Sequence, residues 1–196
     1  MAKIAVEREE HLKKGKIAQE ILRVLNERPM NVLSYKGTTM STAFLPCLEQ
    51  YGIGRRRKNS IRVAINRLRR QRFIEYGAAG ERNTVQLTSA GKRRILQYDF
   101  ERLRLDSSLR WDGVWRLVMF DIPEAQKRAR DAVSKKLKQL GFYQLQRSVL
   151  VHYMACREEI EFIQSFFMLG GLITYIEAHS LGFHEEKLRR FFRIRE

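Results

Sequence analysis

The sequence contains few residues of the kinds that build disulfide-rich, metal-binding or membrane-spanning proteins. Its only two cysteines, Cys47 and Cys156, lie far apart without neighbouring ligand residues, so we expect neither a disulfide framework nor a structural zinc site. No hydrophobic run approaches the length that spans a bilayer, and the charged residues 1–10 lack the apolar stretch of a signal peptide. We therefore expect a soluble, cytoplasmic protein that does not bind a membrane.

Acidic residues are too few to balance the basic ones. The chain of 196 residues has 38 Lys and Arg against 22 Asp and Glu, a formal net charge of +16. Residues 1–110 carry 24 basic and 11 acidic residues, whereas residues 111–196 carry 14 and 11. This balance predicts a polyanionic partner that contacts mainly the first half. The hydrophobic content of 44% is enough for a packed core.

The first half has the pattern of three helices, a hairpin and a further helix. Apolar residues at helical spacing predict helices around Ile17–Leu25, around Phe44–Tyr51 and around Ile61–Leu68. Pro46 falls inside the second of these stretches, so that helix is expected to be kinked or to start late. Two short strands flank residues 77–80, and Thr88-Ser89 is a suitable N-cap for a basic fourth helix. This order predicts a winged-helix DNA-binding domain over residues 10–105.

The second half alternates between strand and helix patterns after a boundary at residues 104–111. We expect, in order, a strand over 115–122, a helix from 123 to Gly141, one strand over 143–153 with an irregularity near Gln146, a helix around 160–167, a strand over 172–178 and a short helix over 184–192. The fold class is therefore α+β, with a ferredoxin-like domain over residues 111–196 whose fourth strand the pattern does not locate.

One basic segment has the features of a DNA-recognition helix. Residues 55–72 contain nine basic residues and no acidic one, whereas a solvated helix face usually mixes both signs. Asn59, Arg62, Asn66 and Arg69 are spaced 3, 4 and 3 apart, which predicts that they share the solvent side of the helix, the side that enters the major groove. Arginine suits guanine and asparagine suits adenine, although Asn59 is also placed to be the helix N-cap. The candidate DNA contacts are Arg55, Arg56, Arg57, Lys58, Asn59, Arg62, Asn66, Arg69, Arg70 and Arg82, the last at the tip of the wing.

Both halves resemble a known family of repressors. The stretch WDGVWRLVMFDIPE at residues 111–124 is similar to the central domain of phenylacetate-catabolism repressors of the PaaX type, which itself resembles CRISPR-associated protein two. The resemblance extends to Arg128, Arg130-Asp131, Leu137, Gly141-Phe142 and Ser148-Val149, and residues 61–68 look like the N-terminal domain of the same repressors. It implies a repressor that forms a homodimer through residues 111–196 and binds double-stranded DNA. The resemblance also implies a further C-terminal domain, which we do not expect here because the sequence runs only to Glu196, and we therefore assign no effector ligand.

Two other functions remain open at this stage. In the CRISPR-associated relatives, an aspartate at the place of Asp121 is linked to metal-dependent phosphodiester cleavage, so a nuclease that uses Asp121 is the alternative. We favour a simpler interpretation, in which Asp121 caps the helix that begins near Pro123. A structural DNA-binding protein without sequence preference is the third possibility. We expect no cofactor, no catalytic residue and no enzymatic activity, since no triad or metal cluster can be assembled from the spacing.

Overall fold

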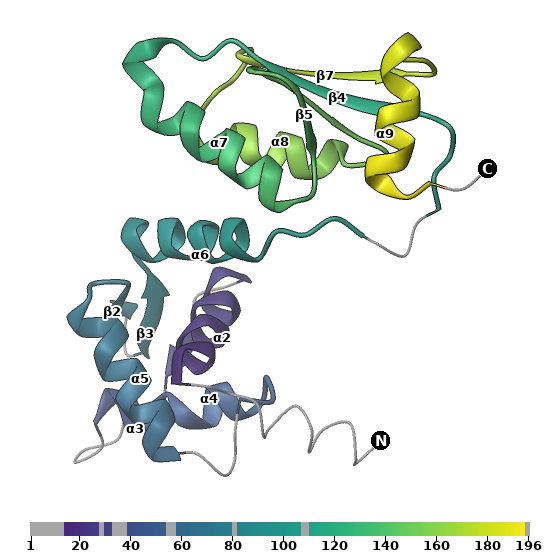
Figure 1. The fold of residues 1–196 in the computed structure, drawn as a ribbon. Helices are drawn as coiled ribbons and strands as arrows, with labels where there is room; N and C mark the ends of the chain where they lie inside the picture. Colours follow the sequence, from purple (N-terminus) through teal and green to yellow (C-terminus); the bar gives the residue numbers. More distant parts are fainter. Residues whose placement is uncertain are drawn as a thin grey trace. The chain divides into compact units, whose positions relative to one another are not determined.

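The protein is a mixture of helices and antiparallel sheets, which confirms the expected α+β class. The structure, a computed structural model, describes residues 14–27, 30–32, 39–53, 58–79, 82–106 and 110–194 (Figure 1). The contacts divide the chain into two compact units, residues 1–99 (unit 1) and residues 100–196 (unit 2). Within the described ranges, none of the helices combines the length and the apolar character needed to cross a membrane.

Unit 1 combines helices with a small three-stranded sheet. Its elements are α2 (Lys14–Glu27), β1 (Met30–Val32), α3 (Met40–Ala43), α4 (Leu45–Glu49), α5 (Lys58–Arg70), β2 (Ile74–Ala79), β3 (Arg82–Leu87) and α6 (Ser89–Arg102), of which the residues from 100 onward belong to unit 2. Pro46 lies in the first turn of α4, where a missing N–H is harmless, so the expected late start is confirmed. The sheet order is β1-β3-β2, with Val85 paired to Met30 on one side and to Tyr76 on the other.

The core of unit 1 is made where the apolar stripes of its helices meet the sheet. Ile21 and Leu22 of α2, Leu48 of α4 and Ile65 of α5 are fully buried, and Val85 extends this core into the sheet. Burial of these branched aliphatic side chains stabilises the unit, at about 1.5–3 kcal/mol for each fully buried residue. The same packing fixes the rotation of α5 about its own axis and so determines which of its side chains face solvent.

Unit 2 is built around a four-stranded sheet. Its elements are β4 (Trp115–Phe120), η1 (Glu124–Gln126), α7 (Lys127–Gln139), β5 (Tyr143–Gln146), β6 (Val149–His152), α8 (Arg157–Phe166), β7 (Ile173–Ala178), η2 (Gly182–His184) and α9 (Glu185–Phe192). The strand order is β5-β6-β4-β7, and all three pairings are antiparallel.

The expectation of a single strand over residues 143–153 was wrong. The chain reverses at Arg147 and Ser148, and Gln146 pairs with Val149 across the turn. The expected irregularity is a register shift between Gln144 and Gln146 inside this hairpin. The apolar residues before and after the turn fall on the same alternation, and neither turn residue is a glycine or an asparagine, so the pattern alone does not reveal the turn. The hairpin supplies the fourth strand of the sheet.

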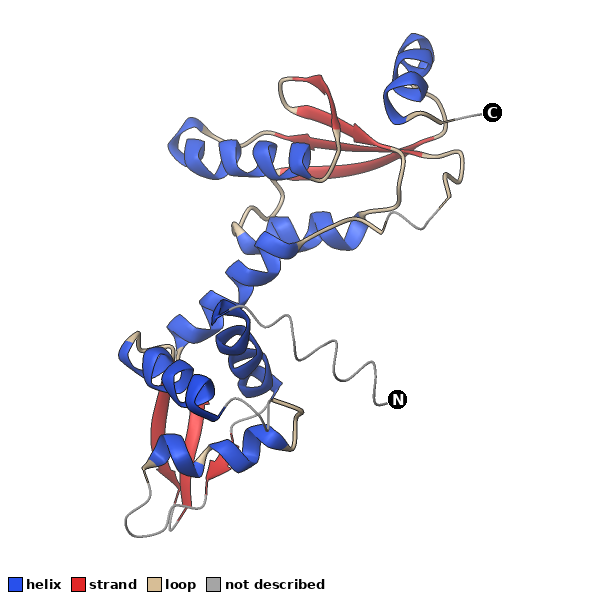
Figure 2. Cartoon of the chain, turned by 60° about the horizontal axis from the view of Figure 1, so that its bottom comes forward, coloured by secondary structure: helices blue, strands red, loops and turns tan. Residues whose placement is uncertain are grey.

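The two faces of this sheet have separate apolar clusters. Val118 and Leu150 point to the face covered by α7 and α8, where Val133 and Ile163 complete the main core. The alternate residues Trp115 and Val151 point to the opposite face and pack against Leu188 of α9. Figures 1 and 2 show α7 and α8 on one side of the strands and α9 on the other. The two clusters form because successive side chains of a strand point to opposite faces of the sheet.

The segment that follows Asp99 packs within unit 2. Phe100 stacks on Phe166 with 4.5 Å between ring centroids. The buried Lys136 donates hydrogen bonds of 3.4 Å to the carbonyl oxygens of Glu101 and Leu103. The contacts therefore divide the chain between residues 99 and 100, a few residues before the 104–111 boundary that we expected from the charge pattern.

Candidate nucleic-acid interface

Helix α5 of unit 1 has one buried face and one basic face. Ile61, Ala64, Ile65 and Leu68 are buried, in agreement with the helical spacing of these residues. The remaining residues of α5 are all exposed, and none of them is acidic. Such a face presents hydrogen-bond donors and positive charge to solvent, and no carboxylate of the same helix neutralises them. A surface of this kind favours the binding of a polyanion.

The structure places six of the ten candidate DNA contacts in this helix with described side chains. Lys58, Asn59, Arg62, Asn66, Arg69 and Arg70 are all exposed residues of α5. Asn59 lies inside the helix, since the helix already includes Lys58, so the alternative in which Asn59 is the N-cap is wrong. Arg55, Arg56 and Arg57 lie outside the described residues, and Arg82 begins β3 with a side chain that lies outside them.

Two of these cations have neighbours that orient them. The Arg69 guanidinium lies over the Tyr76 ring of β2, 4.9 Å from the ring centroid, so its charge is directed toward the hairpin. Burial raises the pKa of the Tyr76 phenol and the charge of Arg69 opposes this rise, so the ring stays neutral beneath the cation. Lys58 lies 3.9 Å from a Glu49 carboxylate oxygen in α4. The Lys58 side chain is largely exposed and the Glu49 side chain partly so, and this long contact leaves the Lys58 charge available to a stronger partner.

The sequence pattern missed further residues that surround this helix. Arg72 and Lys92 are exposed, and Arg72 has a left-handed backbone with φ of 56° at the turn into β2. A shallow pocket of about 530 Å³ lies between Arg69, Arg72 and Lys92, with Thr88 and Ser89 on its wall. Val63 is 64% exposed on α5. The exposure of Val63 could have been found by projecting the sequence of α5 on a helical wheel. The pocket could not, because residues of the hairpin form part of its lining.

The start of α6 joins the turn after α5. The Thr88 hydroxyl donates to the Arg72 carbonyl oxygen at 2.6 Å and accepts from the Gly91 N–H at 3.0 Å, which confirms the expected N-cap. A Cβ added to Gly91 would lie 2.1 Å from the Phe73 carbonyl oxygen. The backbones of α6 and of the α5–β2 turn therefore meet directly, and this contact sets the position of α5 against the hairpin.

Asp121 does not have the capping role that we expected. The N-cap residue of η1 is Pro123 and that of α7 is Gln126, and no side chain caps either helix. The Asp121 backbone N–H donates to the Leu172 carbonyl oxygen at 3.0 Å, which keeps the chain extended beyond β4, and its carboxylate is exposed. The described part of the chain brings together no group of three His, Cys, Asp or Glu residues suited to a metal ion.

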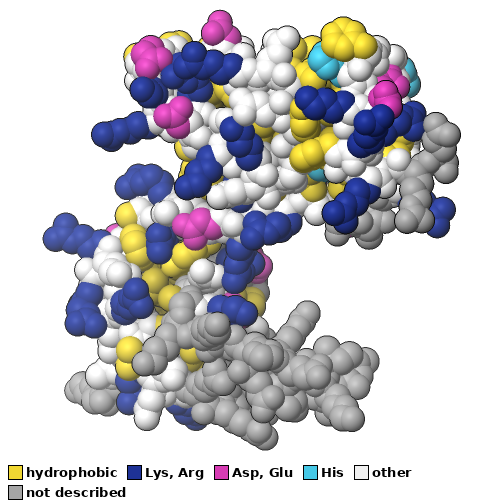
Figure 3. All heavy atoms as spheres, viewed as in Figure 1, with side chains coloured by type: hydrophobic (Ala, Val, Ile, Leu, Met, Phe, Trp, Pro, Cys, Tyr) yellow, Lys and Arg dark blue, Asp and Glu magenta, His cyan; other side chains and the backbone are white. Residues whose placement is uncertain are grey.

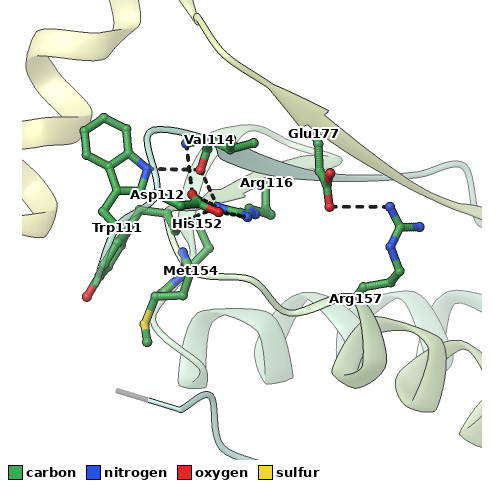
Figure 4. A network of polar contacts seen from close by, with 9 residues as sticks. Trp111, Asp112, Val114, Arg116, His152, Met154, Arg157 and Glu177 are labelled. Atoms are coloured by element: carbon green, nitrogen blue, oxygen red, sulfur yellow. Dashed lines mark hydrogen bonds and ion pairs between the residues drawn. The ribbon is translucent and has the colours of Figure 1, made fainter. Parts of the chain in front are cut away.

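A buried arginine organises the polar interior of unit 2 (Figure 4). Arg116 is 5% exposed. Its guanidinium donates to both Asp112 carboxylate oxygens at 2.5 Å, and to the carbonyl oxygens of Val114 and Tyr153 at 2.7 and 3.1 Å. The hydrogen bonds from Arg116 lower the pKa of Asp112 to about 2, and the same contact raises the pKa of Arg116. Both groups therefore stay charged near neutral pH.

His152, the last residue of β6, is a buried structural residue. Its Nδ1 accepts a hydrogen bond of 3.0 Å from the Met154 N–H, so that nitrogen carries no proton. Aromatic rings surround it, with Phe142 and Phe192 about 5 Å away between centroids. Burial, with a smaller contribution from the Arg116 charge, lowers the pKa of His152 to about 4.

Both cysteines are free thiols. Cys47 is partly buried and donates to the Asn31 carbonyl oxygen at 3.5 Å. Cys156 is buried, and burial raises the pKa of its thiol to about 12. A thiol with so high a pKa is almost entirely protonated at neutral pH and is a poor nucleophile and metal ligand.

Figure 3 shows Lys and Arg side chains on the described surface of both units, with Asp and Glu side chains among them. The buried apolar side of α5 and the contact of Arg69 with the Tyr76 ring distinguish this helix from the general distribution. Its basic residues lie on one continuous face that contains no carboxylate.

Comparison with known proteins finds a similarity for unit 2. Residues 108–189 match the family model described as the PaaX protein central Cas2-like domain. The matched residues lie entirely within unit 2 and include all four strands of its sheet. No curated protein matches the chain. Residues 108–189 of unit 2 are therefore similar to a PaaX-type central domain, which supports the resemblance noted from residues 111–124.

Proposed function

We propose that the protein is a transcriptional regulator that binds a specific sequence of double-stranded DNA as a homodimer and has no enzymatic activity. The observation that carries the proposal is the exposed face of α5, a helix with four buried apolar residues and no acid, followed directly by an antiparallel hairpin. The match of unit 2 to the central domain of a family whose members regulate transcription supports it independently.

The element order of unit 1 supports a winged helix. Four described helices precede the hairpin of β2 and β3: α2, the two short helices α3 and α4, and α5, which carries the basic face. In winged-helix proteins this helix occupies the major groove while the hairpin lies beside it. In this arrangement α5 supplies the base contacts, and Arg82 and the residues before α5 contact phosphates.

The sheet of unit 2 supports a ferredoxin-like fold. Numbered from its first strand, the antiparallel order β5-β6-β4-β7 reads 2-3-1-4, and a helix follows the first and third strands. This is the β-α-β-β-α-β arrangement. We propose that residues 111–196 form the homodimer, so that two copies of unit 1 bind the two halves of a palindromic site.

The test is selection of bound duplexes from a random-sequence library by the full chain. We expect one sequence to be enriched and to bind about 10³-fold or more tightly than a shuffled duplex of the same composition. Asn66→Ala should reduce this ratio, whereas Lys138→Ala on the exposed surface of α7 is the matched control and should preserve it. Equal affinity for the selected and shuffled duplexes would instead identify a non-specific structural DNA-binding protein.

The homodimer is tested separately by sedimentation of the full chain. A two-fold-symmetric selected sequence together with a dimeric mass supports the proposal. A monomeric chain at micromolar concentration that selects a single, asymmetric site would contradict the dimer while leaving DNA recognition in place.

A further inference from the structure

The centre of the exposed face of α5 contains an apolar residue. With 3.6 residues per turn, each residue advances by about 100° around the helix. Measured from the mean direction of the four buried residues, the positions within about 30° of the opposite side are Asn59, Val63, Asn66 and Arg70. Arg62 and Arg69 lie nearer the flanks of the helix, at roughly 70° and 90° from the side opposite the core. The residues farthest from the core are thus two amides, one arginine and one valine.

Neither packing nor helix formation accounts for Val63. Its side chain is 64% exposed, more than any other large hydrophobic side chain described in unit 1, where Leu96 follows at 46%. Valine is a weaker helix former than alanine, lysine or arginine, so an exposed helical position does not favour it on local grounds. Isolated exposed apolar residues are common on protein surfaces. This one lies between amide and guanidinium groups at the centre of the face that the proposed function directs at DNA.

The major groove offers one apolar group that suits such a side chain. Among the four bases, only thymine presents a methyl group, at C5, on the edge that faces the major groove. Asn59 and Asn66 are four residues before and three after Val63, so their side chains neighbour it on the helix surface. Asparagine suits the N6 and N7 atoms of adenine, which belongs to the same type of base pair as thymine.

We propose that Val63 is a specificity-determining residue that contacts the C5-methyl group of a thymine in the major groove. The proposal rests on the proposed function and deepens it, since it predicts that each half-site contains an A·T pair at the centre of the α5 contact. Asn59 or Asn66 then reads the adenine of this pair or of an adjacent one, and Val63 excludes water from the thymine methyl group.

The test replaces thymine by deoxyuridine, which lacks only the methyl group, at one position at a time in the duplex selected by the full chain. Loss of one buried methyl group should weaken binding about fourfold at one thymine per half-site, the equivalent of about 0.8 kcal/mol. Val63→Ala should bind the unmodified duplex less tightly and should discriminate between thymine and uracil by less than about 1.5-fold. Alanine is the best helix former, so this substitution leaves α5 intact.

Leu96→Ala is the matched control, because it removes exposed apolar surface from α6 in the same unit. It should keep the fourfold discrimination. Three results would overturn the inference while leaving the proposed function in place: a selected site without a recurrent A·T pair, uracil tolerated at every position, or full discrimination in Val63→Ala. Failure of the selection to enrich any sequence would refute the proposed function first, and the role of Val63 with it.

Discussion

Arg116 and Asp112 form a bidentate ion pair in which a buried guanidinium is neutralised by a carboxylate at the rim of the sheet. The Arg116 side chain is 6% exposed and that of Asp112 is 53% exposed. Asp112 also accepts a hydrogen bond of 3.0 Å from the Val114 N–H, which holds the loop before β4 against the arginine. The only two tryptophans of the chain, Trp111 and Trp115, immediately precede Asp112 and Arg116 in the sequence, so tryptophan fluorescence follows the unfolding of this region.

We predict that Asp112→Ala destabilises unit 2 by about 1–3 kcal/mol. The substitution leaves the Arg116 charge buried without its counterion, although the exposure of Asp112 reduces the effect below that of a fully buried pair. Chemical denaturation of the full chain followed by tryptophan fluorescence measures it. Glu177→Ala is the control, because its pair with Arg157 is exposed on both sides and should contribute less than about 1 kcal/mol. Equal effects of the two substitutions would contradict the structural role of Arg116.

The burial of His152 predicts a loss of stability in mild acid. The pKa of His152 is lowered to about 4, whereas an unfolded histidine titrates near 6.5. Between these values the unfolded chain binds the additional proton, so this residue's contribution to the free energy of unfolding falls as the pH decreases from 6.5 to 4. The slope from this group is at most about 1.4 kcal/mol per pH unit.

His152→Gln should therefore flatten the dependence of unfolding free energy on pH between 6.5 and 4. His179→Gln, at an exposed position after β7, should leave the slope of the wild type unchanged. Denaturation series at several pH values in this window compare the three proteins. If His152→Gln and the wild type show the same slope, His152 is not held in its neutral form by burial.

Gly91 is predicted to be intolerant of any side chain. A methyl group at this position would lie 2.1 Å from the Phe73 carbonyl oxygen, and this clash with backbone cannot be relieved by a change of rotamer. We expect Gly91→Ala to destabilise unit 1 by about 2–3 kcal/mol and to weaken DNA binding in proportion to the unfolded fraction. Gly170→Ala, where an added Cβ meets nothing within 4 Å, should be neutral. Circular dichroism and thermal unfolding distinguish the two.

Substitution of Asp121 distinguishes a regulator from a nuclease. Because its carboxylate is exposed and caps neither η1 nor α7, Asp121→Ala should change the free energy of unfolding by less than about 0.5 kcal/mol. We also expect no cleavage of labelled duplex or single strands with Mg²⁺ or Mn²⁺. Metal-dependent cleavage by the wild type that disappears in Asp121→Asn would establish the nuclease alternative.

Much of the fold follows from the periodicity of the sequence, but its sheets depend on contacts that periodicity does not contain. The buried stripe of α5 and the Thr88 cap are local features, so their residue types predict them. Strand β1 has only three residues and exists because Val85, distant in sequence, pairs with Met30. The hairpin turn at Arg147 and Ser148 lacks the glycine, asparagine or aspartate typical of two-residue hairpins, so the alternation on either side conceals it.

The candidate site was predictable to a similar degree. The acid-free composition of α5 and the exposure of its basic residues follow from the sequence. The direction of the Arg69 guanidinium does not, because the Tyr76 ring that holds it belongs to a strand whose position depends on the whole unit. Asp121 shows the converse: its place before Pro123 suggested a cap, but the chain stays extended through Pro123, with ψ of 154°, and the first helical turn begins beyond reach of its side chain.

Arg62 and Arg69 are predicted to contribute to DNA binding in different ways. Both are exposed on α5, but only Arg69 has its guanidinium over the Tyr76 ring, which directs it along the hairpin rather than outward. We expect Arg62→Ala to weaken binding to the selected site by about 1–3 kcal/mol and to relax the base preference at one position. Arg69→Ala should weaken binding to all duplexes alike and lower the dependence of log affinity on log salt concentration by about one unit, since it removes a phosphate contact.

Titrations of selected and shuffled duplexes at several salt concentrations measure both effects, with Arg128→Ala on the exposed surface of α7 as the control for loss of one positive charge. A loss of base preference in Arg69→Ala equal to that in Arg62→Ala would mean that the contact with Tyr76 opens on binding and that both arginines read bases.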